Sequence, residues 1–253
     1  MNPILRRIVF FIGALGLAAM YLLAFVHLPD AGQWRDRYLA AINSRCVPER
    51  HLTDAVSAVN FDYRGIDTLG EEFILFVSVV GATVLLRQPD EIARGLKKDA
   101  VHAGRDVGLS DGGRFWIFVS LGPKLMLGIY IVTHGQLTPG GGFQGGVVLS
   151  SAALILYLGE GFLRFKKVVP HRLIEWTEAA AVGTFVLIGL AGMILGDAFL
   201  QNVLPLGEKG TLTSGGTVPL ISAATGLEVA AGFTLLLFGF LQEMLLSDRE
   251  KHA

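Results

Sequence analysis

Long apolar blocks separated by polar connections run through this chain, and six of the blocks can cross a bilayer as helices. A transmembrane helix needs about 20 mostly apolar residues. The pattern predicts spans at residues 8–26, 69–86, 115–132, 143–162, 179–195 and 218–246, the fifth with an alternative start at Leu173. It therefore predicts an all-α, polytopic membrane protein of about six transmembrane helices.

The first apolar block could also be the core of a cleavable signal peptide. It runs from Ile8 to Val26 and follows Arg6 and Arg7. This run of about 19 residues exceeds the roughly 7–15 apolar residues of a signal peptide. We therefore interpret it as an uncleaved span.

Composition supports a membrane protein. The chain has 253 residues, of which 52% are hydrophobic and 17% charged, and its mean hydropathy is +0.54. A soluble domain would carry about 25% charged residues. The net charge of −1 gives no bulk attraction to nucleic acid. The single cysteine, Cys46, excludes an internal disulfide and a cysteine-based metal cluster.

Basic residues in the connections predict the orientation, because cytoplasmic loops carry an excess of lysine and arginine. The connections before the first span, after the second and fourth spans, and after the last span hold Arg6, Arg7, Arg87, Arg94, Lys97, Lys98, Arg105, Arg114, Arg164, Lys166, Lys167, Arg172, Arg249 and Lys251. The loop at 27–67 also holds arginines, but long loops obey the rule less strictly. Both termini are predicted to be cytoplasmic, in a multi-pass protein of the cell inner membrane.

A polar cytoplasmic stretch divides the chain. Residues 88–113 are predicted to link an N-terminal part with two spans, 1–87, to a C-terminal part with four spans, 114–253. On the outer side, residues 53–68 are predicted to include a short surface helix before the chain re-enters the membrane.

Two ionisable residues lie deep in predicted spans. Lys124 is at the middle of the third span, directly after the helix-disrupting Pro123, and Glu228 is four residues from the middle of the sixth. A charge at this depth costs roughly 2.5–3.5 kcal/mol on insertion scales and usually marks an ion pathway or an ion pair. We predict one of these two roles for Lys124 and Glu228, and the sequence leaves both open.

Other ionisable residues lie nearer the predicted interfaces. Glu175 and Glu178 share a helix face at the cytoplasmic start of the fifth span, because they are spaced i,i+3. Solvation alone explains charges at such depths, yet the same groups are candidates for an ion pathway. This second set of candidates is Glu71, Glu72, Glu175, Glu178 and His134, with Glu160 closing the fourth span on the cytoplasmic side.

The residues give no sign of catalysis. The histidines lack the H-E-x-x-H spacing of a zinc site, and no serine lies in a G-x-S-x-G elbow. We therefore expect neither an enzyme nor a bound metal or cofactor.

The stretch GQLTPGGGFQGGV contains a formal match to the dinucleotide-binding pattern G-x-G-x-x-G. Such a turn must follow a strand and open a helix, whereas these glycines follow a predicted span on the outer side. We predict instead that Thr138 caps the next helix and Pro139 is its first residue. Two overlapping G-x-x-x-G pairs then present a smooth face for close helix packing. These pairs are Gly141 with Gly145 and Gly142 with Gly146.

The run from Thr133, THGQLTPGGGFQGGVVLSSAALIL, resembles the signature of the MnhB domain, which is the B subunit of the Mrp-type Na+/H+ antiporters. The resemblance covers the four C-terminal spans. The run from Asn60, with R-G-x-D-T-L-G-E at Arg64 to Glu71, resembles the end of the large A-type Mrp protein. The corresponding segment is the separate small E protein in membrane-bound hydrogenases. The chain thus resembles a fusion of two pieces that are often separate.

The resemblance implies an integral subunit of a multi-subunit complex that exchanges monovalent cations, chiefly Na+, for protons, with other Mrp-type subunits as partners. It implies no redox cofactor on this subunit. Three alternatives stay open: the same module in a redox-driven, hydrogenase-like complex, a purely structural scaffold, and a stand-alone carrier.

Overall fold

Helices form nearly all of the regular structure of this protein. The computed structural model describes residues 3–27, 37–86 and 110–252, in which no strand occurs. Six of the described helices are long and apolar enough to span a membrane. They are α1 (Pro3–Val26), α4 (Gly65–Leu85), α6 (Asp111–Thr133), α7 (Gly142–Val168), α8 (His171–Leu195) and α9 (Val218–His252). The predicted all-α fold with six spans is confirmed.

The starts of two helices refine the predicted spans. Helix α8 begins at His171, so the alternative early start of the fifth span is correct. Helix α4 begins at Gly65, with Asp67 in its first turn, where a negative charge favours the helix dipole. Glu71 and Glu72 therefore lie in the second turn of α4 and do not open the span.

Short helices occupy the predicted outer connection. They are α2 (Arg37–Arg50), α3 (Ala55–Ala58) and the π-helical turn η1 (Val59–Tyr63). Asp54 caps α3 by accepting a hydrogen bond from the Ser57 N–H at 2.9 Å. The predicted short helix is thus present at α3, although Ser57 and Ala58 in it are buried. Nothing in the apolar pattern predicted α2.

The chain divides into two compact units, Met1–Ala41 and Ile42–Ala253. The first unit contains α1, whose span buries none of its residues. The second contains the other five long helices, so α4 belongs to the same unit as the four C-terminal spans. Most of the predicted linker, residues 88–109, lies outside the described residues.

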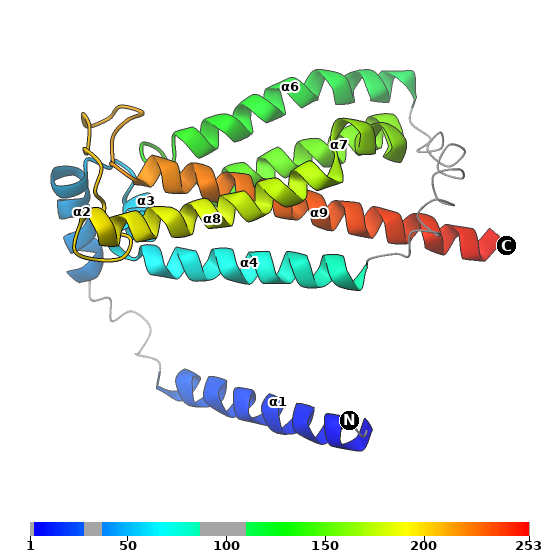
Figure 1. Ribbon diagram of the computed structural model, residues 1–253, viewed down its shortest axis with the longest axis horizontal. Coiled ribbons are helices and arrows are strands. Elements are labelled where there is room, and N and C mark those ends of the chain that lie inside the picture. The colour runs from blue at the N-terminus through cyan, green and yellow to red at the C-terminus, as the bar shows by residue number, and fades with distance from the viewer. Residues whose placement is uncertain (1–2, 28–36, 87–109, 253) are drawn as a thin grey trace. The chain divides into compact units, whose positions relative to one another are not determined.

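Helix α9 is the central helix of the second unit. It packs against α4, α6, α7 and α8, and Figure 1 shows it running between α7 and α4. Within this chain 61% of its span is buried, against 39% or less for every other described span. A side chain on α9 is therefore the best placed to meet groups from several helices. We call the end of this unit that holds α3 and residues 196–217 the outer end, after the predicted topology, and the opposite one the inner end.

Glycines let α7 approach both α6 and α9. A Cβ atom added to Gly145 would lie 2.8 Å from the carbonyl oxygen of Gly128 on α6. A Cβ added to Gly146 would lie 2.8 Å from the carbonyl oxygen of Gly226 on α9. Both distances are too short for a real carbon atom, so the backbones pack directly, as in small-residue contacts between membrane helices. The predicted packing role of these glycines fits this geometry.

The predicted start of this helix is wrong. Thr138 and Pro139 lie in a turn, and α7 begins at Gly142 with Gly141 as its N-cap residue. Gly141 has a φ of 120°, which L side chains rarely adopt. A Cβ at Gly142 would collide with Ser222 and Thr225 of α9. Tertiary contact with α9 therefore sets the start of α7, against the local capping preference of the Thr-Pro pair.

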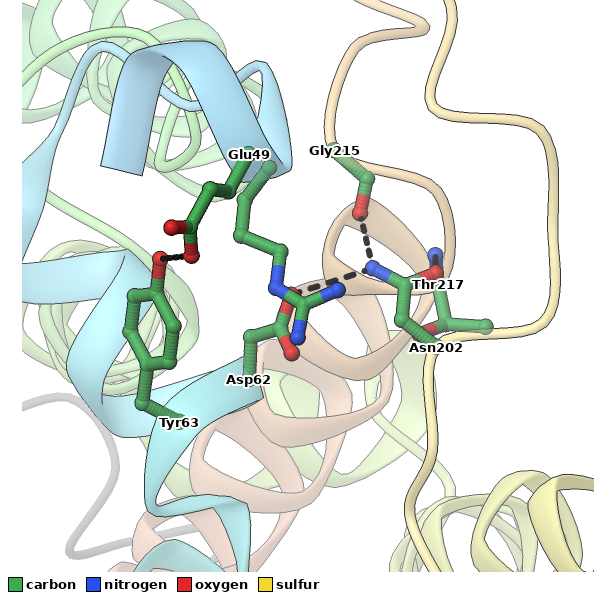
Figure 2. Close-up of polar contacts among 7 residues, drawn as sticks. Glu49, Asp62, Tyr63, Asn202, Gly215 and Thr217 are labelled. Atoms are coloured by element: carbon green, nitrogen blue, oxygen red, sulfur yellow. Dashed lines mark hydrogen bonds and ion pairs between the residues drawn. The ribbon is translucent and has the colours of Figure 1, made fainter. Parts of the chain in front are cut away.

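A polar network at the outer end joins η1 to the loop before α9 (Figure 2). The Asn202 amide donates to Asp62 Oδ2 at 3.2 Å and to the Gly215 carbonyl at 2.9 Å. Its oxygen accepts from the Thr217 N–H at 2.9 Å. Arg50 adds an ion pair, with its Nε 3.3 Å from Asp62 Oδ2. One asparagine thus fixes the start of α9 relative to the start of α4.

We predict that Gly145→Ala destabilises the full chain by roughly 1–3 kcal/mol, because the added methyl group must push α6 away from α7. The measurement is thermal unfolding of the purified chain in detergent. The matched control is Gly183→Ala in α8, where an added Cβ meets nothing within 4 Å. This control should unfold at the same temperature as the wild type or slightly above it, since alanine favours helix. Equal losses in both variants would contradict the packing role of Gly145.

The Asp62 carboxyl predicts a pH dependence of stability. Burial raises its pKa above the ordinary value of 3.8, while Arg50 and Asn202 oppose the shift. The folded protein therefore holds this proton more tightly than the unfolded chain, and the Asp62 contribution to stability falls as pH rises from 3.8 through the raised pKa. We expect the unfolding temperature of the wild type to fall relative to that of Asp62→Asn as pH rises across this window. A constant difference would refute the coupling.

Candidate functional site

Three glutamates are buried where α4, α8 and α9 meet. Glu72 on α4 and Glu228 on α9 have no exposed surface, and Glu178 on α8 is 3% exposed. Both carboxylate oxygens of Glu72 and of Glu228, and one of Glu178, have no hydrogen-bond partner within the described chain. Unpaired carboxyl groups at membrane depth are expensive and mark functional sites.

One face of α9 brings these three groups into a series. Thr225, Glu228 and Gly232 are spaced i, i+3 and i+7, so they share a helix face. The Thr225 hydroxyl lies beside the Glu72 carboxylate, although no hydrogen bond of standard geometry joins them. Glu228 lies one turn further along this face, toward the inner end.

Gly232 leaves room on α9 for the carboxyl group of Glu178. A Cβ added to Gly232 would lie 3.2 Å from Glu178 Oε1, so the carboxylate rests against the bare backbone of α9. From Thr225 to Gly232 the rise along the helix is about 10 Å. Among the described residues, no three acidic, histidine or cysteine side chains converge as metal ligands would. The arrangement is therefore a row of separate carboxyl groups along α9.

A cavity at the inner end reaches the last carboxyl group of this row. It has a volume of about 700 Å³ and lies between α4, α8 and α9. Phe76, Val80 and Leu235 contribute apolar walls, while Glu178 and the Glu175–His171 pair contribute polar groups. His171 Nδ1 lies 3.4 Å from Glu175 Oε1. Glu178 is thus buried in the bundle yet borders a space large enough for water.

The structure separates the remaining candidates from this row. Lys124 is half-buried on α6 and forms no ion pair with any described residue, Glu228 included. The predicted alternative of a Lys124–Glu228 ion pair is therefore not formed within the described chain. Glu71 is exposed beside its buried neighbour Glu72. Glu160 pairs with Arg164 at 3.6 Å near the inner end.

His134 is placed as an interfacial residue. It follows α6 at the outer end, where its ring stacks on Tyr130 with 4.0 Å between the ring centroids. Its Nδ1 lies 3.1 Å from the Tyr130 carbonyl oxygen and 3.2 Å from Thr133 Oγ1. These contacts are all local, so the structure does not bring His134 into the carboxylate row.

Sequence reasoning missed the uncharged members of the site. Thr225 and Gly232 carry no charge and stand out only when the neighbours of α9 are known. Gln136 was also missed: it is fully buried at the outer end, and its amide donates to the Leu212 carbonyl at 2.8 Å. Its position inside the glycine-rich stretch between α6 and α7 was the one available signal.

The C-terminal spans match a known family. Residues 117–235 match the family described as a domain related to the MnhB subunit of Na+/H+ antiporter. Two Na(+)/H(+) antiporter B subunits, from Alkalihalophilus pseudofirmus and Bacillus subtilis, are 36% and 30% identical to this chain over 80 and 78 residues. Each match covers 31% of this chain and 54% of the relative, so the chain spans about half the length of these two proteins.

Two longer similarities extend over both parts of the chain. An uncharacterized protein of Methanocaldococcus jannaschii is 28% identical in an alignment of 218 positions that covers 78% of this chain and 80% of that protein. A chain in the structure of the membrane-bound sulfane sulfur reductase, an archaeal respiratory membrane complex, has a TM-score of 0.69 and 28% identity. That similarity covers 94% of this chain and 98% of the other.

The Mrp complex from Dietzia sp. DQ12-45-1b shares the fold. One of its chains has a TM-score of 0.61 and 22% identity to this chain, covering 92% of this chain and 26% of the other. Together with the family match and the six spans, these similarities identify the chain as a multi-pass membrane protein that contains an MnhB-type domain at residues 117–235.

Proposed function

We propose that this chain is a non-catalytic subunit of a multi-subunit, Mrp-type complex in the cell inner membrane that exchanges Na+ for protons. The MnhB-type domain and the antiporter B subunits that resemble it support this role. Other Mrp-type subunits are its proposed partners. The subunit carries no cofactor in this proposal.

The row of three buried carboxyl groups along α9, contributed by α4, α8 and α9, is the observation that carries the proposal. Glu178 borders the inner cavity, Glu228 lies at the centre of the bundle, and Glu72 lies toward the outer end. A carboxyl group passes a proton by releasing it from one oxygen and accepting another in its place. Water in the cavity would deliver protons to Glu178, and side-chain rotation or intervening water would connect the others. The row thus provides part of a path for protons or for a cation that replaces them.

A redox-driven respiratory complex is the second candidate host. The similarity to a chain of the sulfane sulfur reductase complex covers almost the whole of both chains. The similarity to the antiporter B subunits covers about half of each relative. In such a host, electron transfer on other subunits would drive ion movement, and the carboxylate row would keep the same role.

A third candidate is a scaffold that only holds neighbouring subunits together. The direct backbone contacts at Gly145 and Gly146 favour it, because they serve packing alone. A scaffold does not need unpaired carboxyl groups in its centre, which are a cost without benefit. Variants that remove only the charge therefore separate the scaffold from an ion path.

We predict that Glu228→Gln and Glu178→Gln each lower the rate of cation-coupled proton transport by roughly tenfold or more. A tenfold loss corresponds to an increase of about 1.4 kcal/mol in the activation free energy. Glutamine keeps the shape of the side chain but cannot exchange a proton. The measurement is dye-reported proton movement in membrane vesicles that contain the whole complex, with Na+ added to start exchange. Complex content is determined in the same vesicles.

The matched control is Glu208→Gln, because Glu208 is exposed in the loop before α9. It should transport at the wild-type rate. Normal transport in all three variants, with normal complex content, would leave the scaffold as the explanation. Loss of the complex itself in the Glu228→Gln variant would mean that this residue acts in assembly.

We further predict that native affinity purification of this chain recovers a hetero-oligomeric membrane complex. Mass spectrometry of the recovered subunits distinguishes the two hosts, because a redox-driven complex contains subunits with redox cofactors and an antiporter does not. Recovery of this chain as a single, transport-active species would contradict both.

A further inference from the structure

Lys124 places a positive charge at mid-depth on the least buried helix of the second unit. Within this unit, 11% of the α6 span is buried, which is less than for any other described span. Lys124 itself is half-buried, and its neighbours Pro123 and Leu125 are exposed. A charged side chain in this position is costly unless it meets an opposite charge.

The helices that pack against α6 offer no acid at the level of Lys124. Antiparallel α7 contacts α6 through Gly128 with Leu149, and again through Ile117 with Gly159. Lys124 therefore lies level with residues 152–153 of α7, in a stretch without acidic residues. Glu160, the nearest acid on α7, is about two turns further toward the inner end.

Glu228 on α9 is also out of register. Val132 of α6 contacts Gly226 on antiparallel α9, so the residue of α9 level with Lys124 is close to Thr234. Glu228 lies six residues from that level, or about 9 Å toward the outer end. This offset explains the missing ion pair.

The N-terminal helix cannot supply the charge either. Helix α1, Pro3–Val26, contains no aspartate or glutamate. Even if α1 covered this face of α6, it would bring no acid to Lys124. Neither α1 nor the described helices that pack against α6 thus bring an acid to the level of Lys124.

We propose that the exposed flank of α6 beside Lys124, on the side of Ser120 and Leu127, binds a transmembrane helix of a different subunit, which places an aspartate or glutamate carboxylate against the Lys124 ammonium group. The surface suits a close helix. Ser120 lies one turn before Lys124 and Leu127 about one turn after it, and both are exposed, so a neighbouring helix can approach the ammonium group from this side. The proposal rests on the proposed function only in requiring partner subunits.

The test uses a photo-reactive amino acid placed at Leu127 in the full chain within its native complex. Leu127 is three residues from Lys124 on the same helix face and is 52% exposed. The control position is Met126, which is 73% exposed but points about 200° away around the helix. We expect the Leu127 probe to cross-link to a transmembrane peptide of another subunit that contains an acidic residue at mid-span. Cross-links at Leu127 only to lipid, to a second copy of this chain, or to a helix without an acid would overturn the proposal.

Charge reversal provides the second test. Lys124→Glu should reduce recovery of that subunit with this chain by roughly tenfold or more, because two carboxylates would face each other in a low dielectric. Changing the partner's acid to lysine in the same cells should restore recovery. Lys167→Glu is the matched control, because Lys167 is exposed and lies beyond the span of α7. Reversing this charge should leave recovery of the partner subunit unchanged.

Unchanged recovery with Lys124→Glu, or no restoration by the reciprocal change, would refute the ion pair. These outcomes differ from a failure of the proposed function. Purification of this chain without partners would refute the function, whereas an intact complex with no acidic helix near Leu127 would refute only the docking site.

Discussion

Close backbone contact between α9 and its neighbours is the constraint on which the rest of this structure depends. Gly146 lets α7 approach the Gly226 carbonyl and the Val229 side chain of α9, and Gly142 abuts the same helix at Ser222. Any larger residue there would separate the helices. This contact decides where α7 begins and holds α9 in the centre of the second unit. Because α9 is central, groups from α4 and α8 meet along one of its faces.

The same packing that excludes lipid also isolates the three carboxyl groups. Glu72, Glu178 and Glu228 lie among apolar helices. Of these three residues, only Glu178 lines the inner cavity. The free energy that this arrangement costs has to come from the helix contacts around it. Packing and ion movement are therefore not competing explanations of the subunit, because the glycines create the environment in which the carboxyl groups can act.

The charges deepest in the spans of the second unit are kept apart by sign. The unpaired acids face the interior of the second unit, whereas Lys124 lies on its outermost helix, out of register with every acid of the helices packed against it. The outer network of Arg50, Asp62 and Asn202 lies beyond the spans and fixes the ends of α4 and α9. A separation of this kind fits the proposed role as a subunit whose charges at membrane depth are completed by neighbouring subunits.

The sequence alone determined the helical class and the six spans, because the hydrocarbon core imposes a length and a polarity that can be counted along the chain. The MnhB-type domain was recognised separately, from the resemblance of the run that begins at Thr133. The sequence also singled out Lys124 and Glu228, since charge at membrane depth is rare, and it included Glu72 and Glu178 among the candidates nearer the interfaces. It could not separate Glu228 from Lys124, nor Glu72 and Glu178 from the other candidates near the interfaces, because depth along a helix says nothing about which side faces a neighbour. Tertiary structure alone decided the start of α7, the contact of Glu178 with Gly232 and the isolation of Lys124. Each of these depends on which helices touch and at what register, and that information is spread over residues far apart in the chain.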